Sequence, residues 1–214
     1  MLDGPLQSLI NGQQAEHISI RDRGLQYGDG CFETIRVLSN TPILWSAHLK
    51  RLEHACKVLQ LSVNFDSLQS EISQILQLNK AADVILKIII TRGEGGRGYA
   101  PTKQADPTRI LQLIDYVAPA TNKGARVVLC QHRLSSNSNL AGIKHLNRLD
   151  QILASAQIPT ECDEGLCMNE EGYLIEACRS NLLLAIDDEL VTPDLSKSGI
   201  EGVMLNHLIA EFAK

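Results

Sequence analysis

Lys144 is the residue of this chain whose position best suits covalent chemistry. It lies in the run Ala-Gly-Ile-Lys-His-Leu-Asn-Arg at residues 141–148. Residues 125–130 are predicted to form a strand, and apolar residues recur at helical spacing from Leu146 to Ala156. A lysine amine at such a junction can form a Schiff base if its surroundings favour the neutral form. An ordinary surface lysine is the alternative, so the assignment depends on other residues.

Three further segments carry residues that suit the same chemistry. Glu176 and Asn181 place an acid and an amide between two short apolar runs. Arg51 belongs to a His-Leu-Lys-Arg-Leu run that opens an amphipathic helix. Residues 199–202, Gly-Ile-Glu-Gly, open the last predicted helix, where backbone amides can bind an anion. The chain therefore offers a carboxylate, a guanidinium and an anion site to accompany the lysine.

Together with the run at residues 21–34, these segments resemble the fold-type-IV pyridoxal-phosphate enzymes. That family includes branched-chain and D-amino-acid aminotransferases and the aminodeoxychorismate lyases. The resemblance runs from about residue 10 to the end and rests on the order and joint presence of the motifs. Four motifs are most similar in sequence to those of the lyases: Gly-Asp-Gly-Cys-Phe, Ser-Ala-His-x-x-Arg-Leu, Arg-Gly-x-Gly-Gly-Arg-Gly-Tyr and Leu-Ala-Gly-Ile-Lys-His-Leu-Asn-Arg-Leu.

The resemblance implies that pyridoxal 5'-phosphate is the cofactor and that Lys144 is the catalytic residue. Lys144 would bind the cofactor covalently and, once displaced by a substrate amine, would act as the proton-transferring base. Glu176 would face the pyridine nitrogen, where a carboxylate favours the protonated ring. Asn181 would be a further cofactor-binding residue. A strand-edge glutamate in water is the alternative for Glu176.

The resemblance also implies a binding site for the cofactor phosphate. Arg51 would bind it through a charge-assisted, two-pronged contact, although a helix-surface arginine is the alternative. The backbone amides of Ile200 and Glu201 would complete the site at the start of the last helix. Two positions depart from the family pattern. Glu201 stands where many relatives carry a hydroxyl or amide residue, and Leu205 stands where an arginine is common.

Four residues are expected to bind the substrate. Arg97 and Tyr99 belong to a glycine-rich loop that would lie over it, since a substrate with two carboxylates needs at least one guanidinium. A solvated hairpin tip is the alternative for this loop. Phe32 and His145 would line the pocket, and His145 is equally compatible with a packed histidine at a helix start.

Within the family, the lyase reaction is the expected activity. It converts 4-amino-4-deoxychorismate to 4-aminobenzoate and pyruvate, a step of folate biosynthesis. An aminotransferase acting on D- or branched-chain amino acids uses the same cofactor residues and is the first alternative. A non-catalytic relative of the fold is the second. The resemblance also implies a homodimer.

Composition restricts the partners of the chain. Its 214 residues are 44% hydrophobic, which is enough for a substantial core. The net charge of -5 argues against nucleic acid as a partner, because phosphate binding needs a basic face. The apolar run at residues 84–90 is too short to span a membrane, and the acid at Asp3 does not fit a signal peptide. We therefore expect a cytoplasmic protein that acts on a small molecule.

The six cysteines are expected to be reduced thiols. Cys162 and Cys167 are separated by four residues, and the sequence contains no Cys-x-x-Cys motif. Cys31, Cys130 and Cys178 lie in apolar or strand-like surroundings, where a cysteine behaves as a small hydrophobic residue. The sequence therefore predicts no metal site.

The resemblance implies an α+β fold of two domains with the cofactor between them. We expect an N-terminal domain at 1–117, a linker at 118–124 and a mostly β C-terminal domain at 125–214. The family continues past the last helix with further strands, so we expect either a truncated sequence or an unusually short second domain, incomplete at its C-terminus. A doubly wound parallel sheet is disfavoured, because no glycine-rich turn between strand and helix is present. The expected elements of the first half are strands at 18–20, 32–38, 83–91 and 108–116 and helices at 46–59 (N-cap Ser46) and 65–78.

Overall fold

The chain forms two units, Met1–Ala118 and Pro119–Lys214. They are seen in a computed structural model that describes residues 7–101, 105–118 and 124–212. Of the linker expected at 118–124, residues 119–123 lie outside this described part. Within the described ranges, no helix is long and apolar enough to cross a membrane.

The first unit is built on a six-stranded antiparallel sheet with the strand order β2-β1-β6-β5-β3-β4. Its strands are β1 (Gln7–Ile10), β2 (Gln13–Gln14), β3 (Gly30–Leu38), β4 (Thr41–Pro42), β5 (Asp83–Thr91) and β6 (Thr108–Asp115). The long strands β3, β5 and β6 were all predicted from their runs of β-branched and apolar residues. The strand expected at 18–20 is wrong, because those residues form no strand and Ile20 is exposed.

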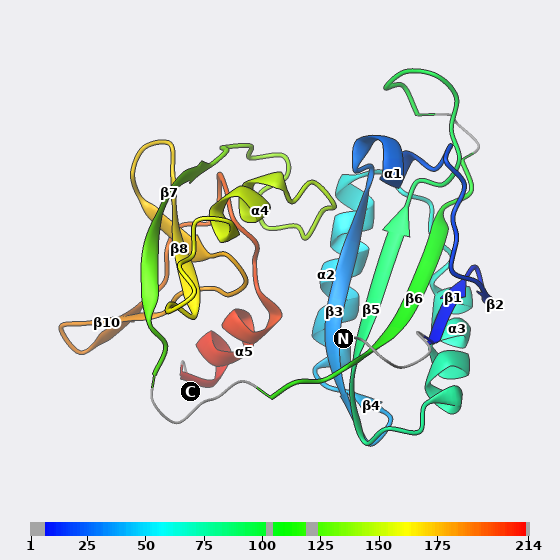
Figure 1. Ribbon diagram of the computed structural model, residues 1–214, viewed down its shortest axis with the longest axis horizontal. Helices are drawn as coiled ribbons and strands as arrows, with labels where there is room; N and C mark the ends of the chain where they lie inside the picture. Colours follow the sequence, from blue (N-terminus) through cyan, green and yellow to red (C-terminus); the bar gives the residue numbers. More distant parts are fainter. Residues whose placement is uncertain (1–6, 102–104, 119–123, 213–214) are drawn as a thin grey trace. The chain divides into compact units, whose positions relative to one another are not determined.

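Two long helices, α2 (Trp45–Val58) and α3 (Phe65–Leu78), cover one face of this sheet, and the short α1 (Arg23–Tyr27) precedes β3 (Figure 1). Register explains the shared face: Cys31 pairs with Ile90, and Ile90 pairs with Arg109. Cys31 contacts α2 and Arg109 contacts α3. Side chains that alternate along each strand therefore point to the helices or away from them.

The two helix starts differ in how they are capped. Asn64 accepts a hydrogen bond from the Ser67 amide at 3.0 Å and caps α3. The N-cap of α2 is Leu44, in a left-handed conformation with φ of 51° and no side-chain cap. The prediction of Ser46 as N-cap is therefore wrong, since Ser46 lies inside the first turn. The turn before it is tight enough to bring the Ile43 amide to the Arg36 carbonyl.

The second unit contains a three-stranded mixed sheet in the order β7-β8-β9. Strand β7 is parallel to β8, and β8 is antiparallel to β9. A separate hairpin, β10-β11, turns at Asp187 and Asp188, both at positive φ. The elements of this unit are β7 (Val127–Leu134), α4 (Leu149–Ser155), β8 (Glu164–Asn169), β9 (Leu174–Ala177), β10 (Leu184–Ile186), β11 (Glu189–Val191) and α5 (Val203–Phe212).

Candidate functional site

Lys144 and Glu176, the two most important predicted residues, lie in the same unit and close to each other. Lys144 is partly buried in the irregular segment between β7 and α4. Glu176 lies on β9 and is 4% exposed. The charge of Lys144 acts on the Glu176 carboxyl. The second unit therefore brings a nucleophilic amine near a buried carboxyl group.

The Glu176 carboxyl is held by two donors. The Ile200 amide donates to Oε2 at 2.8 Å, and Gln151 Nε2 donates to Oε1 at 3.3 Å. Burial raises the pKa of Glu176, and these hydrogen bonds with the charges of Arg148 and Lys144 offset that effect only in part. A buried carboxyl group with a raised pKa is stabilised by a cationic or N–H partner.

The predicted phosphate donors are engaged elsewhere. The Ile200 amide binds Glu176, and the Glu201 amide donates to the Gly142 carbonyl at 3.0 Å. Helix α5 begins only at Val203, so residues 199–201 form a bridge to Gly142 and not the first turn of a helix. The helix start expected at residues 199–202 is therefore wrong, whereas binding of the cofactor phosphate by the Ile200 and Glu201 amides stays a prediction. The amides at the N-terminus of α5 belong to Val203 and the residues after it.

Asn181 supports the start of α5. Its Nδ2 donates to the Ile200 carbonyl at 2.7 Å, and its Oδ1 lies directly against Gly202. Gly202 is needed here because a Cβ atom would overlap with the Asn181 amide group. In this unit Asn181 fixes the turn that leads into the helix.

His145 lines a pocket of about 290 Å³ that is formed within the second unit. Arg148 Nη2 donates to His145 Nε2 at 2.7 Å. Burial and the charge of Arg148 lower the pKa of His145 to about 4, so the imidazole is neutral at neutral pH. Among the described residues, Arg148 Nε and Nη1 and the buried Ser198 hydroxyl have no hydrogen-bond partner. Since Arg148 and Ser198 both line the pocket, it has the polarity of an anion site.

Arg51, in the first unit, is held by a buried carboxylate. Its Nε and Nη2 donate to the two oxygens of Glu33 at 2.7 and 2.6 Å, and His48 Nδ1 lies 2.7 Å from Oε2. Burial would raise the pKa of Glu33, but the hydrogen bonds from Arg51 and His48 outweigh it and lower that pKa. These bonds use one edge of the guanidinium and fix its orientation.

Arg97 and Tyr99 are exposed in the loop between β5 and β6, and their backbone is anchored by Arg23. Arg23 is 3% exposed, and it donates from Nη1 to the Gly98 carbonyl at 2.9 Å and from Nη2 to the Tyr99 carbonyl at 2.8 Å. The Tyr99 ring also packs edge-on against Tyr27. The side chains of Arg97 and Tyr99 are therefore exposed to solvent, while the buried side chain of Arg23 holds the loop backbone at Gly98 and Tyr99.

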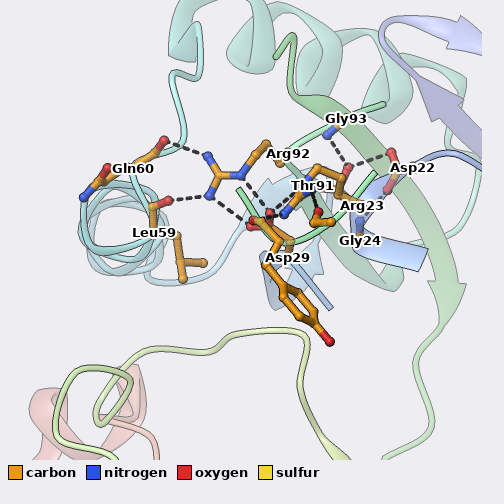
Figure 2. A network of polar contacts seen from close by, with 11 residues as sticks. Asp22, Arg23, Gly24, Asp29, Leu59, Gln60, Thr91, Arg92 and Gly93 are labelled. Carbon is orange, nitrogen blue, oxygen red and sulfur yellow. Dashed lines mark hydrogen bonds and ion pairs between the residues drawn. The ribbon is translucent and has the colours of Figure 1, made fainter. Parts of the chain in front are cut away.

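Asp29 connects this anchor to the rest of the unit. It accepts from Arg23 Nε at 2.9 Å and from Arg92 Nε at 2.8 Å, and Arg92 also donates to the Leu59 and Gln60 carbonyls (Figure 2). Burial acts to raise the pKa of Asp29, but the two arginines lower it overall. The end of α2, the start of β3 and the loop after β5 are therefore joined through one carboxylate.

Asp22 ties the start of α1 to two strands. Its Oδ1 accepts from the Gly24 amide at 2.8 Å, and its Oδ2 accepts from the hydroxyls of Thr91 and Thr108 at 2.8 and 2.9 Å. Sequence reasoning missed Asp22, Arg23 and Asp29 as positioning residues. The run at residues 21–34 contributed to the resemblance, but its pattern does not distinguish a buried arginine from a solvated one.

Phe32, the remaining predicted substrate residue, lies on β3 with its side chain on the sheet face opposite α2. Its neighbours Cys31 and Glu33 both contact α2, and side chains alternate along a strand. Phe32 is half-buried there.

The chain matches the amino-transferase class IV family over residues 30–214. It is 34% identical over 202 residues to aminodeoxychorismate lyase from Vibrio harveyi, covering 91% of this chain and 73% of that protein. It is similar to the crystal structure of 4-amino-4-deoxychorismate lyase from Pseudomonas aeruginosa, with a TM-score of 0.89 and 40% identity over 96% of this chain and 77% of that one. Branched-chain amino acid aminotransferase from Escherichia coli shares the fold, with a TM-score of 0.82 at 20% identity, over 95% of this chain and 73% of that one. The predicted fold-type-IV architecture is confirmed.

Replacing Glu33 tests the buried cluster on β3 and α2. Glu33→Ala should lower the free energy of unfolding by about 3–5 kcal/mol, because it leaves Arg51 without its buried partner. Glu33→Gln keeps the shape and removes the charge. A lowered folded-state pKa stabilises the protein above the unfolded value of about 4.3, and this stabilisation is lost as pH falls through the folded pKa. In urea unfolding, the difference in free energy of unfolding between wild type and Glu33→Gln should therefore become smaller as the pH is lowered.

Glu53→Gln is the matched control, since Glu53 is exposed on α2, the helix that carries Arg51 and His48. It should change the unfolding free energy by less than about 0.5 kcal/mol at any pH. A Glu33→Gln variant as stable as the control at neutral pH would contradict a stabilising role for the charge.

Replacing Arg23 tests whether it anchors the loop. Arg23→Met should speed tryptic cleavage after Arg97 by roughly tenfold or more, because local opening no longer breaks charge-assisted hydrogen bonds of roughly 1.5 kcal/mol or more. Arg21→Met is the control: Arg21 pairs with Glu94 of the same loop at 2.7 Å, but its side chain is 71% exposed. Equal cleavage rates in the two variants would show that the loop does not depend on Arg23.

Proposed function

The chain belongs to the amino-transferase class IV family, and from that premise we propose that it is a pyridoxal 5'-phosphate-dependent aminodeoxychorismate lyase. The reaction converts 4-amino-4-deoxychorismate to 4-aminobenzoate and pyruvate. The observation that carries the cofactor assignment is the closeness of Lys144 to the buried carboxyl group of Glu176. The choice of lyase is supported by the two lyases at 34% and 40% identity, whereas the aminotransferase structure shares the fold at 20%.

The residues of the second unit fit this cofactor. Glu176 is buried with a raised pKa, which suits a carboxylate that receives a pyridinium N–H. Lys144 is close enough for its charge to act on Glu176. The ring of the cofactor would therefore lie with its nitrogen at Glu176, and the amine of Lys144 would hold its aldehyde carbon. Asn181 supports this site through the turn before α5.

We propose Arg51, in the first unit, as one ligand of the cofactor phosphate. In the second unit, we propose the amides of Ile200 and Glu201 as further donors, and the structure adds those of Val203 and Met204 at the start of α5. A helix N-terminus of this kind favours an anion through its unpaired N–H groups and its dipole. Glu33 and His48 orient Arg51 for the contact.

For the substrate, we propose Arg97 as a carboxylate ligand, with Tyr99, Phe32 and His145 as further contacts. Arg97 is exposed on a backbone held by Arg23. His145 is neutral, so it offers an uncharged hydrogen-bonding side chain. In the second unit the unpartnered N–H groups of Arg148 make the pocket beside His145 a site for an anionic group.

Each residue then has a defined task in the reaction. The cofactor, when bound, supplies an electron-withdrawing ring that stabilises negative charge at the amine-bearing carbon. Lys144 removes the proton from that carbon. The ether C–O bond to the enolpyruvyl group breaks, enolpyruvate leaves with the bonding electrons and takes up a proton to become pyruvate, and the ring becomes aromatic as 4-aminobenzoate. Glu176 would provide the carboxylate for the ring nitrogen of the cofactor, and Arg97 would hold the substrate by a carboxylate.

We further propose a homodimer, on the family resemblance, and a cytoplasmic location, on the composition and the cysteines. The five buried cysteines and Cys162 are all free thiols, as expected where thiols are kept reduced.

Lys144→Ala is the direct test of the proposed catalyst. Wild-type protein supplied with the cofactor and aminodeoxychorismate should release 4-aminobenzoate and pyruvate in equal amounts without any added keto acid. Lys144→Ala should lower turnover by several orders of magnitude, because the covalent and base functions are lost together. Lys57→Ala is the control, since Lys57 is exposed near the end of α2. Amine transfer that requires a keto acid, with no 4-aminobenzoate, would identify an aminotransferase instead.

Arg97→Ala separates substrate binding from cofactor binding. It should leave the cofactor absorbance intact and raise KM for aminodeoxychorismate by about one to two orders of magnitude, matching a lost charge-assisted contact of roughly 1.5–3 kcal/mol. Arg97→Lys should recover little, because an ammonium lacks the two-pronged geometry. Unchanged kinetics would make this loop a solvated hairpin. Loss of cofactor would make it a structural element.

A further inference from the structure

Three cysteine side chains from separate segments of the second unit meet in its interior. Cys130 lies on β7, Cys167 on β8 and Cys178 directly after β9. Their three sulfur atoms all lie within 4.8 Å of one another, and Cys167 Sγ is 3.7 Å from Cys178 Sγ. All three side chains are buried. We call this group the thiol cluster.

Gly165 makes room for the cluster. The Cys178 amide donates to the Gly165 carbonyl at 2.8 Å, so the two residues lie across from each other at the end of the β8–β9 ladder. A Cβ atom on Gly165 would lie 2.6 Å from Cys130 Sγ and 3.1 Å from Cys178 Sγ. The two sulfur atoms therefore occupy the space that a side chain at residue 165 would fill.

Simple packing accounts for the burial of these cysteines but not for their convergence. Buried cysteine commonly behaves as a small hydrophobic residue, and Ile158 and Leu195 pack against this core. Three sulfur atoms in mutual contact instead match the spacing in a thiolate metal centre. With metal–sulfur bonds of about 2.3 Å, three sulfur ligands around one ion lie about 4 Å apart. The cluster therefore needs little rearrangement to bind an ion.

We propose that Cys130, Cys167 and Cys178 form a binding site for a soft, thiophilic metal ion, with Cu(I) as the ion that fits best. Thiolates select such ions, and three sulfur ligands satisfy Cu(I). Zn(II) prefers four ligands, and the metal-binding group that the described residues form contains only these three. The site goes beyond the proposed enzymatic function and does not depend on it.

Binding needs no change in oxidation state. Copper–sulfur bonds form as thiol protons leave for solvent, and copper stays Cu(I). Burial and the neighbouring thiols raise the pKa of Cys167, so a metal that binds there displaces a thiol proton. Cys178, at 8% exposure the most accessible of the three, is the entry point. Cys178 follows Glu176 by two residues, so a bound ion would tie the Glu176 strand to β7 and β8.

The test is a Cu(I) titration of the reduced protein without oxygen, against a coloured Cu(I) chelator. Wild type should take one Cu(I) per chain from the chelator, show thiolate-to-copper absorption in the ultraviolet and unfold at a higher temperature. Cys178→Ser and Cys167→Ser should each weaken binding at least tenfold. Wild type that leaves the copper with the chelator would overturn the proposal.

Two controls locate the site. Cys162→Ser removes a thiol outside the cluster, and Cys31→Ser removes one of the Cys31–Cys56 pair of the first unit, whose sulfurs are 3.8 Å apart. Both variants should bind copper like wild type, and loss of binding in either would overturn the assignment. Gly165→Ala retains every thiol but displaces Cys130, so it should also weaken binding. Circular dichroism confirms that each variant is folded, and Cys178→Ser, the least buried change, decides the result if another variant is not.

Discussion

Buried charge must be paired, and this constraint organises both units of the protein. A carboxylate taken out of water loses several kcal/mol of hydration that only close donors can replace. Glu33, Asp29 and Glu176 each meet this requirement in a different way. Glu33 is hydrogen-bonded to Arg51 and His48. Asp29 accepts hydrogen bonds from Arg23 and Arg92. Glu176 accepts them from the Ile200 amide and from Gln151.

The direction of each pKa shift follows from these partners. For Glu33 and Asp29 the arginines outweigh burial, so both stay charged and act as fixed anchors. Glu176 accepts hydrogen bonds from two neutral groups, and Arg148 and Lys144 act on it through their charge. Burial outweighs these effects, and the pKa of Glu176 is raised. The anchored carboxylates orient side chains and loops in the first unit. The incompletely compensated carboxyl group of the second unit is the one that remains suited to a charged cofactor.

Much of the fold and part of the site could be predicted from the sequence. The strands at 83–91 and 108–116 follow from apolar runs, and the helix at 65–78 begins at the capping residue Asn64. Lys144 and Glu176 were predicted from distinctive runs, and the structure places both in the second unit. The last helix begins at Val203 and not at residues 199–202, because glycines on both sides of that segment do not reveal where helical geometry begins.

Contacts between segments that are distant in the sequence could not be predicted from it. Arg23 reaches the Gly98 and Tyr99 carbonyls from more than seventy residues away. The sequence spacing of Cys130, Cys167 and Cys178 does not indicate a metal site. Their sulfur atoms come together only because β7, β8 and the end of β9 are adjacent in the fold. Local patterns specify elements, whereas burial of an arginine or convergence of thiols depends on the sheet register.

Borohydride reduction of the cofactor-loaded protein, followed by peptide mapping, shows which lysine holds the cofactor. Reduction fixes the cofactor permanently to the amine that holds it. One pyridoxyl label per chain is expected, on the peptide that contains Lys144. A label on Lys197, whose side chain lines the pocket beside His145, or on any other lysine would contradict the account.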